Sequence, residues 1–171
     1  AKIILKEKRK GKKIVLCHGV FDLLHVGHIK HFKEAKNLGD ILVVSLTPDM
    51  YVNKGPKRPV FNEELRAEAI SALDAVDYVV LNTNHTAIEM IHKIKPNIYC
   101  KGPDYKNHQN DVSGQIKNEI KAVKKTGGKI TYTRDVTYSS SKLLNQYGNV
   151  YSDFQKVFVK KVNKKYSFKK I

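Results

Sequence analysis

The sequence contains no tryptophan, only two cysteines and only five prolines in 171 residues. Cys17 and Cys100 are too few for a disulfide framework, and both lie in apolar, strand-like runs, which predicts reduced and buried thiols. No apolar run approaches the roughly 20 residues of a membrane span, and the charged first residues do not resemble a secretory signal. We therefore expect a cytoplasmic globular protein that does not enter a membrane.

Arginine is also scarce, because the chain has four arginines against 28 lysines. This chain uses lysine at nearly every position where a general positive charge is sufficient. An arginine in such a chain therefore indicates a task that lysine cannot perform, such as bidentate recognition of a phosphate or carboxylate. Arg9 lies in the basic N-terminal segment, whereas Arg58, Arg66 and Arg134 lie in the body of the chain. These three arginines are candidate ligand-binding residues.

The formal net charge of +16 is unevenly distributed. Residues 1–13 and residues 151–171 each contribute +6, which leaves only +4 for residues 14–150. Solvated lysine-rich helices explain such ends, and binding of RNA or of an anionic surface is the alternative. The mildly basic body argues against nucleic acid as the main partner.

Hydrophobic periodicity alternates between short strands and helices. Continuous apolar runs predict strands over residues 13–17, 41–46, 78–81, 98–100 and 129–132. Helical spacing predicts helices over residues 26–38, 63–73, 86–94, 116–125 and 139–146. This alternation is typical of a Rossmann-like, doubly wound α/β protein with a mostly parallel five-stranded sheet and flanking helices.

One domain accounts for most of the chain. The alternating pattern fills residues 13–150, residues 1–12 predict a basic helix outside that domain, and residues 151–171 predict a basic helix or linker. The lysine-rich end suggests a fragment of a longer polypeptide, in which residues 151–171 would lead towards a second domain.

The stretch HGVFDLLHVGH, residues 18–28, follows the first predicted strand. In open α/β sheets ligands bind beyond the carboxyl ends of the strands, and a helix N-terminus attracts anions. His25 and His28 can direct two ring N–H groups at one phosphate, while Gly27 lets it approach the backbone. A pair of structural histidines and a zinc pair are the alternatives, although no third zinc ligand lies close in the sequence. His31, His85, His92 and His108 have no evident partner.

The complete stretch of residues 18–28 favours phosphate binding over the structural and zinc alternatives for the two histidines. Residues 19–22 (GVFD) followed by residues 25–28 (HVGH) resemble the GxFDxxHxGH signature of the cytidylyltransferase-like nucleotidyltransferases. The resemblance implies that His25 and His28 are catalytic, contacting the nucleotide phosphates and stabilising charge as the α-phosphorus is attacked. It also implies the strand order 3-2-1-4-5 and makes residues 13–150 a nucleotidyltransferase domain.

Further segments are similar to the adenylyltransferase half of bifunctional heptose-phosphate enzymes. Residues 54–60 (KGPKRPV) resemble its KGxxRPV segment, and residues 64–66 (ELR) resemble its ER-type helix motif. Residues 101–105 (KGPDY) resemble its KGGDY motif, and residues 138–142 (YSSSK) resemble its ISTTK motif. The resemblance covers about residues 12–147. The sequence departs from these motifs at three points: Pro103 replaces a glycine, serines replace the threonines, and Tyr138 replaces a small or apolar residue. These departures bear on substrate choice more than on reaction type.

These matches imply roles for individual residues. Lys54 and Arg134 join the two histidines as catalytic residues, and Lys54 and Arg58 would also bind the phosphorylated substrate. Asp22 is expected to order its loop, with a base as the alternative, and a solvated strand-end lysine is the alternative for Lys101. The nucleotide-binding residues implied are Gly19, Val20, Phe21, Asp22, Gly27, Arg66, Lys101, Asp104, Ser139, Ser140 and Ser141. Mg²⁺ is expected to be held mainly by the nucleotide phosphates, without dedicated protein ligands.

The implied reaction transfers a nucleoside monophosphate from a nucleoside triphosphate to a sugar- or polyol-phosphate and releases pyrophosphate. ATP is favoured and CTP is next, and a cytidylyltransferase for glycerol phosphate or a similar alcohol phosphate is the alternative enzyme. The alternative of another class is a non-catalytic nucleotide- or RNA-binding module. The resemblance further implies a homodimer and a sugar kinase domain covalently linked in the parent protein.

Overall fold

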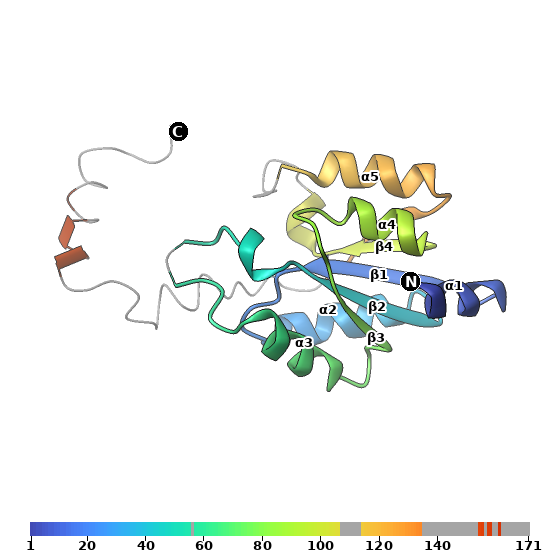
Figure 1. Ribbon diagram of the computed structural model, residues 1–171, viewed down its shortest axis with the longest axis horizontal. Helices are drawn as coiled ribbons and strands as arrows, with labels where there is room; N and C mark the ends of the chain where they lie inside the picture. The colour runs from blue at the N-terminus through green and yellow to red at the C-terminus, as the bar shows by residue number, and fades with distance from the viewer. Residues whose placement is uncertain (56, 107–113, 135–153, 156, 159–160, 162–171) are drawn as a thin grey trace. The chain divides into compact units, whose positions relative to one another are not determined.

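The computed structural model describes residues 1–55, 57–106 and 114–134, together with 154–155, 157–158 and 161 (Figure 1). Residues 1–140 and residues 141–171 form two separate units. The described residues of the second unit are helical. The predicted helix over residues 139–146 and the predicted domain boundary after residue 150 lie outside the described residues.

The core of the first unit is a parallel sheet. Its strands are β1 (Ile14–Gly19), β2 (Ile41–Leu46), β3 (Tyr78–Leu81), β4 (Ile98–Lys101) and β5 (Lys129–Tyr132). They lie in the order β3-β2-β1-β4-β5, and every neighbouring pair is parallel. All six residues of β2 are buried, as expected for a central strand covered on both faces. The predicted fold class and strand order are confirmed.

Helices cover both faces of this sheet. They are α1 (Lys2–Arg9), α2 (Val26–Lys36), α3 (Glu63–Ser71), α4 (Ile88–Ile94) and α5 (Ile116–Lys125), with short 3₁₀ helices η1 (Asp49–Tyr51) and η2 (Pro103–Lys106). In Figure 1, α4 and α5 lie on one face and α2 and α3 on the other. Asn62 caps the N-terminus of α3, because its side chain accepts the Leu65 N–H at 2.9 Å.

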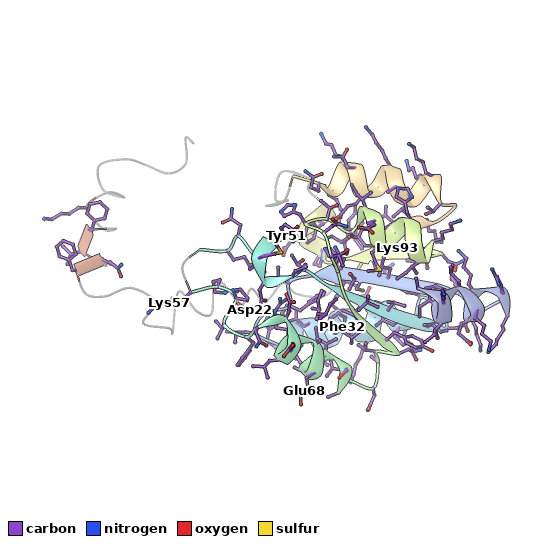
Figure 2. All side chains as sticks on the ribbon, in the orientation of Figure 1. Asp22, Phe32, Tyr51, Lys57, Glu68 and Lys93 are labelled. Atoms are coloured by element: carbon purple, nitrogen blue, oxygen red, sulfur yellow. The ribbon has the colours of Figure 1, made fainter. Side chains whose placement is uncertain are left out.

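Alternation along β1 divides the apolar residues into two cores. Ile14 and Leu16 pack in the core that α1, α4 and α5 cover. Val15 and Cys17 pack in the core that α2 and α3 cover, where Phe32 of α2 is fully buried (Figure 2). Successive side chains of a strand point to opposite faces, so one apolar run supplies both layers. Cys17 and Cys100 are opposite each other in the β1–β4 register, and both are buried free thiols, as predicted.

The basic N-terminal helix is confirmed as α1, but it does not stand outside the domain as predicted. Ile4 is only 3% exposed and belongs to the core of the first unit. The Lys8 ammonium donates a hydrogen bond to the carbonyl of Lys95, at the end of α4. Burial of one apolar side chain therefore attaches the helix to the sheet while most of its lysines stay in solvent.

Candidate active site

The candidate site lies where the strand order reverses, between β1 and β4. The chain runs from β1 to β2 and β3 on one side, and then returns to place β4 and β5 on the other side. At such a switch point the connections leave in opposite directions and open a crevice beyond the carboxyl ends of the strands. The HGVFDLLHVGH stretch leaves β1 at this edge and leads directly into α2.

His25 and His28 come together at the start of α2. His25 has an extended backbone and is the N-cap residue, and its Nδ1 accepts the Gly27 N–H at 3.1 Å. The two imidazole rings stack, with centroids 3.8 Å apart and planes 21° apart. Because Nδ1 of His25 accepts a hydrogen bond, the proton of the neutral ring lies on Nε2. Gly27, predicted to let a phosphate approach the backbone, donates its N–H to this cap.

Burial and neighbouring charge keep this pair neutral. Burial, together with the charges of His25, His31 and Lys54, lowers the pKa of His28 to about 3. Burial also lowers the pKa of His25. Within the described part of the chain, the buried Nδ1 of His28 has no hydrogen-bond partner. A buried polar atom left without a partner calls for an explanation, and a bound anion or its hydrogen-bonding group supplies one.

Two residues between β1 and the histidines shape this pair. Phe21 has a left-handed backbone, with φ of 48°, and its ring meets the His28 ring edge-on at a centroid distance of 5.4 Å. A Cβ on Gly19 would lie 3.0 Å from the Phe21 ring, so a larger residue there would require this ring to shift by a few tenths of an ångström. Gly19 and Phe21 therefore support the histidines, and direct nucleotide contact by either stays a prediction.

Asp22 is buried, and its carboxylate organises the loop that follows β2. It accepts the Val60 N–H at 2.8 Å, the Phe61 N–H at 3.1 Å and the Arg58 Nε–H at 2.5 Å. Burial opposes ionisation, but these donors outweigh it, and the net pKa of Asp22 is lowered. The carboxylate therefore has the loop-ordering contacts expected of it. The Arg58 side chain, predicted to bind substrate, is engaged with this carboxylate.

Arg66 of α3 joins the loops at the same edge of the sheet. The side chain is fully buried and donates to the carbonyls of Val20, Phe61 and Thr47 and to the carboxylate of Asp49. A planar fork of donors can serve several acceptors at once, and an ammonium cannot. The donors of Arg66 are thus directed at this chain's own groups, and its predicted contact with a nucleotide stays a prediction.

The predicted lysines differ in their surroundings. Lys54 is exposed on the loop after β2, and partial desolvation with the charges of Arg58 and Arg66 lowers its pKa, against the opposing effect of Asp22. Lys101, at the end of β4, is only 5% exposed, so the alternative of a solvated strand-end lysine is wrong.

A buried acidic side chain explains how Lys101 is held. Its Nζ lies 3.6 Å from Glu119 Oε2 and 4.1 Å from the centroid of the Tyr105 ring. The same carboxylate accepts the Tyr99 hydroxyl at 2.9 Å and the Ala87 N–H at 3.2 Å. The ion pair fixes the strand end that carries the KGPDY segment, in which Asp104 is exposed.

Other predicted residues lie at or beyond the end of β5. Arg134 is exposed two residues after this strand. Ser139, Ser140 and Ser141 lie outside the described residues, so their triphosphate-binding role stays a prediction. The structure thus brings together the histidine pair and the loops around Asp22 and Arg66 at the carboxyl edge of the sheet.

Two histidines at this edge were missed by sequence reasoning. His18, buried at the end of β1, lies 3.2 Å from Ser45 Oγ and 3.4 Å from Thr47 Oγ1, and burial, with the charge of Lys101, lowers its pKa to about 4. His31 stacks on Phe21 at a centroid distance of 6.5 Å. The available signals were adjacency of His18 to the glycine and the spacing of His31, one helical turn after His28.

The described residues contain neither a membrane-spanning helix nor a cluster of metal-binding side chains. Of the helices described, none is long and apolar enough to cross a bilayer. Likewise, no three or more histidine, cysteine, aspartate or glutamate side chains among the described residues are placed to hold a metal ion.

The fold and the site define a class of protein, namely a doubly wound α/β domain with a histidine pair at its switch point. The family model described as cytidylyltransferase-like matches residues 16–163, and the chain belongs to this family. It is therefore a nucleotidyltransferase.

Curated relatives agree with this assignment. The bifunctional protein HldE of Aliarcobacter butzleri is 44% identical over 133 residues, which are 76% of this chain and 28% of that protein. The bifunctional protein HldE of Geobacter metallireducens is 40% identical over 155 residues, which are 86% of this chain and 30% of that protein. The chain thus spans less than a third of the length of these relatives.

Solved structures show the same fold. The crystal structure of the lipopolysaccharide core biosynthesis protein from Thermoplasma volcanium GSS1 has a TM-score of 0.60 at 32% identity, covering 75% of this chain and 100% of that chain. Pantoate–β-alanine ligase from Francisella tularensis has a TM-score of 0.57 at 17% identity, covering 95% of this chain and 76% of that chain, and shares the fold alone.

Proposed function

We propose that this nucleotidyltransferase moves a nucleoside monophosphate from a nucleoside triphosphate, with ATP favoured over CTP, to a sugar- or polyol-phosphate. The observation that carries the proposal is the stacked His25–His28 pair at the N-terminus of α2, in which a buried ring nitrogen lacks a partner among the described residues. The resemblance of residues 54–60 and 101–105 to the adenylyltransferase half of heptose-phosphate enzymes supports an activated nucleotide-sugar as the product.

The reaction needs charge stabilisation more than a base. An oxygen of the acceptor phosphate attacks the α-phosphorus in line, its bond to phosphorus forms, and the bond to pyrophosphate breaks. The attacking oxygen is already anionic, so no proton has to be removed. The barrier lies in bringing several negative groups together and holding them aligned.

The residues of the site suit that task. His25 and His28 are neutral in the free site; the Nε2–H of His25 can donate to the phosphoryl oxygens where charge develops, and His28 would donate through its Nδ1, which has no partner among the described residues, when that atom carries a proton. Two neutral rings can stack at 3.8 Å, whereas two imidazolium ions would repel each other at that distance. Lys54 and Arg134 would add positive charge, Lys54 towards the acceptor phosphate and Arg134 towards the triphosphate.

Bound Mg²⁺ would neutralise part of the charge of the triphosphate. The donor set fits an ion held mainly by phosphates and water, because N–H and ammonium groups meet phosphate oxygens and do not ligate a cation. Asp22, the buried carboxylate nearest to the histidines in sequence, is already engaged by three donors.

We also propose a second activity in the parent protein. The HldE relatives are named bifunctional, and this chain covers less than a third of their length. A sugar kinase in the same polypeptide would supply the phosphorylated acceptor, and the enzyme would act in the cytoplasm as a homodimer.

The decisive assay measures pyrophosphate release with Mg²⁺, each of ATP, CTP, GTP and UTP, and a panel of heptose, other sugar and polyol phosphates. Release with one nucleotide–acceptor pair is expected. Steep salt-dependent binding of RNA without any release would instead support a non-catalytic binding module, and stoichiometric zinc in the purified protein would support a zinc pair.

Histidine variants test the mechanism in the same assay. His25→Ala and His28→Ala should each lower kcat on the order of 10²-fold, the scale for losing one transition-state donor. His92→Ala removes an exposed histidine of α4 and should leave turnover unchanged. Folded His25 and His28 variants with normal turnover would refute the assigned role.

A further inference from the structure

Helix α2 extends beyond the histidine pair to the segment that follows β5. His28, His31 and Glu34 are spaced three residues apart on this helix and therefore share one side of it. The first of them belongs to the histidine pair, and the other two contact residues about 100 positions later in the chain. One rigid helix thus connects the two segments assigned to the triphosphate.

The contacts with the end of β5 are specific. Nδ1 of His31 lies 3.0 Å from Oγ1 of Thr133, a residue that is only 1% exposed. The carboxylate of Glu34 accepts the backbone N–H of Arg134 with both oxygens, at 3.1 and 2.9 Å. We name these four residues, His31, Glu34, Thr133 and Arg134, the α2–β5 clasp.

A third contact fixes the same strand end from the other side. The Thr133 N–H donates to the carbonyl of Lys101 at 3.0 Å, which continues the pairing of β5 with β4 beyond the end of the strand. The backbone at Thr133 and Arg134 is therefore held between α2 and β4. Hydrogen bonds from a backbone N–H to a carboxylate are among the stronger ones in proteins.

We propose that the α2–β5 clasp sets the position from which Arg134 reaches the triphosphate, with His31 and Glu34 as positioning residues; the inference rests on the proposed function. The Glu34 carboxylate accepts the Arg134 N–H with both oxygens, so it fixes the backbone from which the Arg134 side chain extends. The exposed Arg134 side chain gains a fixed starting point, which lowers the entropy lost when it binds phosphate.

Glu34 variants test the positioning role in the 171-residue chain. Glu34→Ala should raise the KM for the nucleoside triphosphate about tenfold and change kcat less, because a displaced Arg134 weakens triphosphate binding first. Glu34→Gln keeps an acceptor oxygen and should restore most of the affinity. Glu68→Ala, which removes an exposed glutamate of α3 (Figure 2), is the matched control and should behave as wild type.

A double-variant cycle distinguishes positioning from general stabilisation. If Glu34 acts through Arg134, Glu34→Ala should have no further effect on KM in the Arg134→Ala background. Additive effects, or a folded Glu34→Ala variant with unchanged KM, would overturn the proposal. His31→Leu should raise KM in the same direction, and its thermal unfolding is measured alongside so that a folding defect is recognised.

Calorimetric binding of ATP and of inorganic tripolyphosphate separates this proposal from the proposed function. A wild-type chain that binds these anions without releasing pyrophosphate would contradict the enzymatic proposal, and the Glu34 variants would still test the clasp through their Kd. Equal Kd values for wild type and Glu34→Ala would overturn the clasp. A wild-type chain that binds neither anion would overturn both.

Discussion

Substitution of Asp22 by asparagine tests whether this carboxylate orders the site or takes part in the chemistry. Figure 2 labels Asp22 and Lys57, which lies on the loop that Asp22 organises. Asp22→Asn keeps the size of the side chain and one acceptor oxygen for the Val60 and Phe61 N–H groups. It places an amide NH₂, or a neutral oxygen, where the carboxylate now accepts from Arg58.

The expected cost follows from the burial of the ion pair. The side chains of Asp22 and Arg58 are 0% and 7% exposed, so the substitution leaves a buried guanidinium without its counter-charge. Breaking such a pair costs about 3–5 kcal/mol. In a chain of this size 1 kcal/mol corresponds to about 2–4 °C, so the Tm should fall by roughly 6–20 °C.

Thermal and urea unfolding of wild type, Asp22→Asn and Asp74→Asn measure this effect. Asp74 is exposed after the end of α3 and supplies the matched control, for which no change is expected. Asp22→Asn/Arg58→Met should recover part of the lost stability, because the second change removes the uncompensated charge.

Activity measured well below the Tm completes the test. If Asp22 orders the loop, the folded variant should keep the shape of the wild-type pH–rate profile. Unchanged stability with lost turnover and an altered pH profile would refute the structural reasoning and favour the alternative of a base.

Three other outcomes follow from the structure. Burial lowers the pKa values of His18 and His28 to about 4 and about 3, so the unfolded chain binds more protons than the folded chain once the pH falls below about 6.5. The free energy of unfolding should then fall by up to about 1.4 kcal/mol per pH unit for each of the two residues. A free energy from urea unfolding that stays constant at pH 7, 6, 5 and 4 would contradict this prediction. Arg66→Lys should lower the free energy of unfolding by about 3 kcal/mol, because an ammonium cannot replace the four hydrogen bonds of the planar guanidinium. An unchanged midpoint of urea unfolding would show that these hydrogen bonds are dispensable. Glu119→Gln should lower the free energy of unfolding by about 3–5 kcal/mol, because it leaves Lys101 buried without a counter-charge. The double variant Glu119→Gln/Lys101→Met should restore part of this loss, and a double variant as unstable as the single variant would contradict the ion-pair explanation.

The strands and helices could be predicted because their causes are local. A continuous apolar run such as ILVVSL at residues 41–46 predicts a strand covered on both faces, and the structure buries all six of its residues. The Asn62 cap and the glycines after α5 mark helix ends in the same local way. The attachment of α1 could not be predicted in this way, because the burial of Ile4 depends on contacts with distant parts of the chain.

The sequence by itself also determined the family and the histidine pair, because the spacing of His25 and His28 after a first strand is a local motif. Only the tertiary structure decided how charged side chains are used. Arg58 recognises a carboxylate of this chain, and Lys101 is buried against Glu119. Charge partners are chosen by proximity in space, and residues 18 to 100 positions apart meet only after the sheet has formed. For the same reason, the clasp between Glu34 and the backbone of Arg134 has no signal in the sequence.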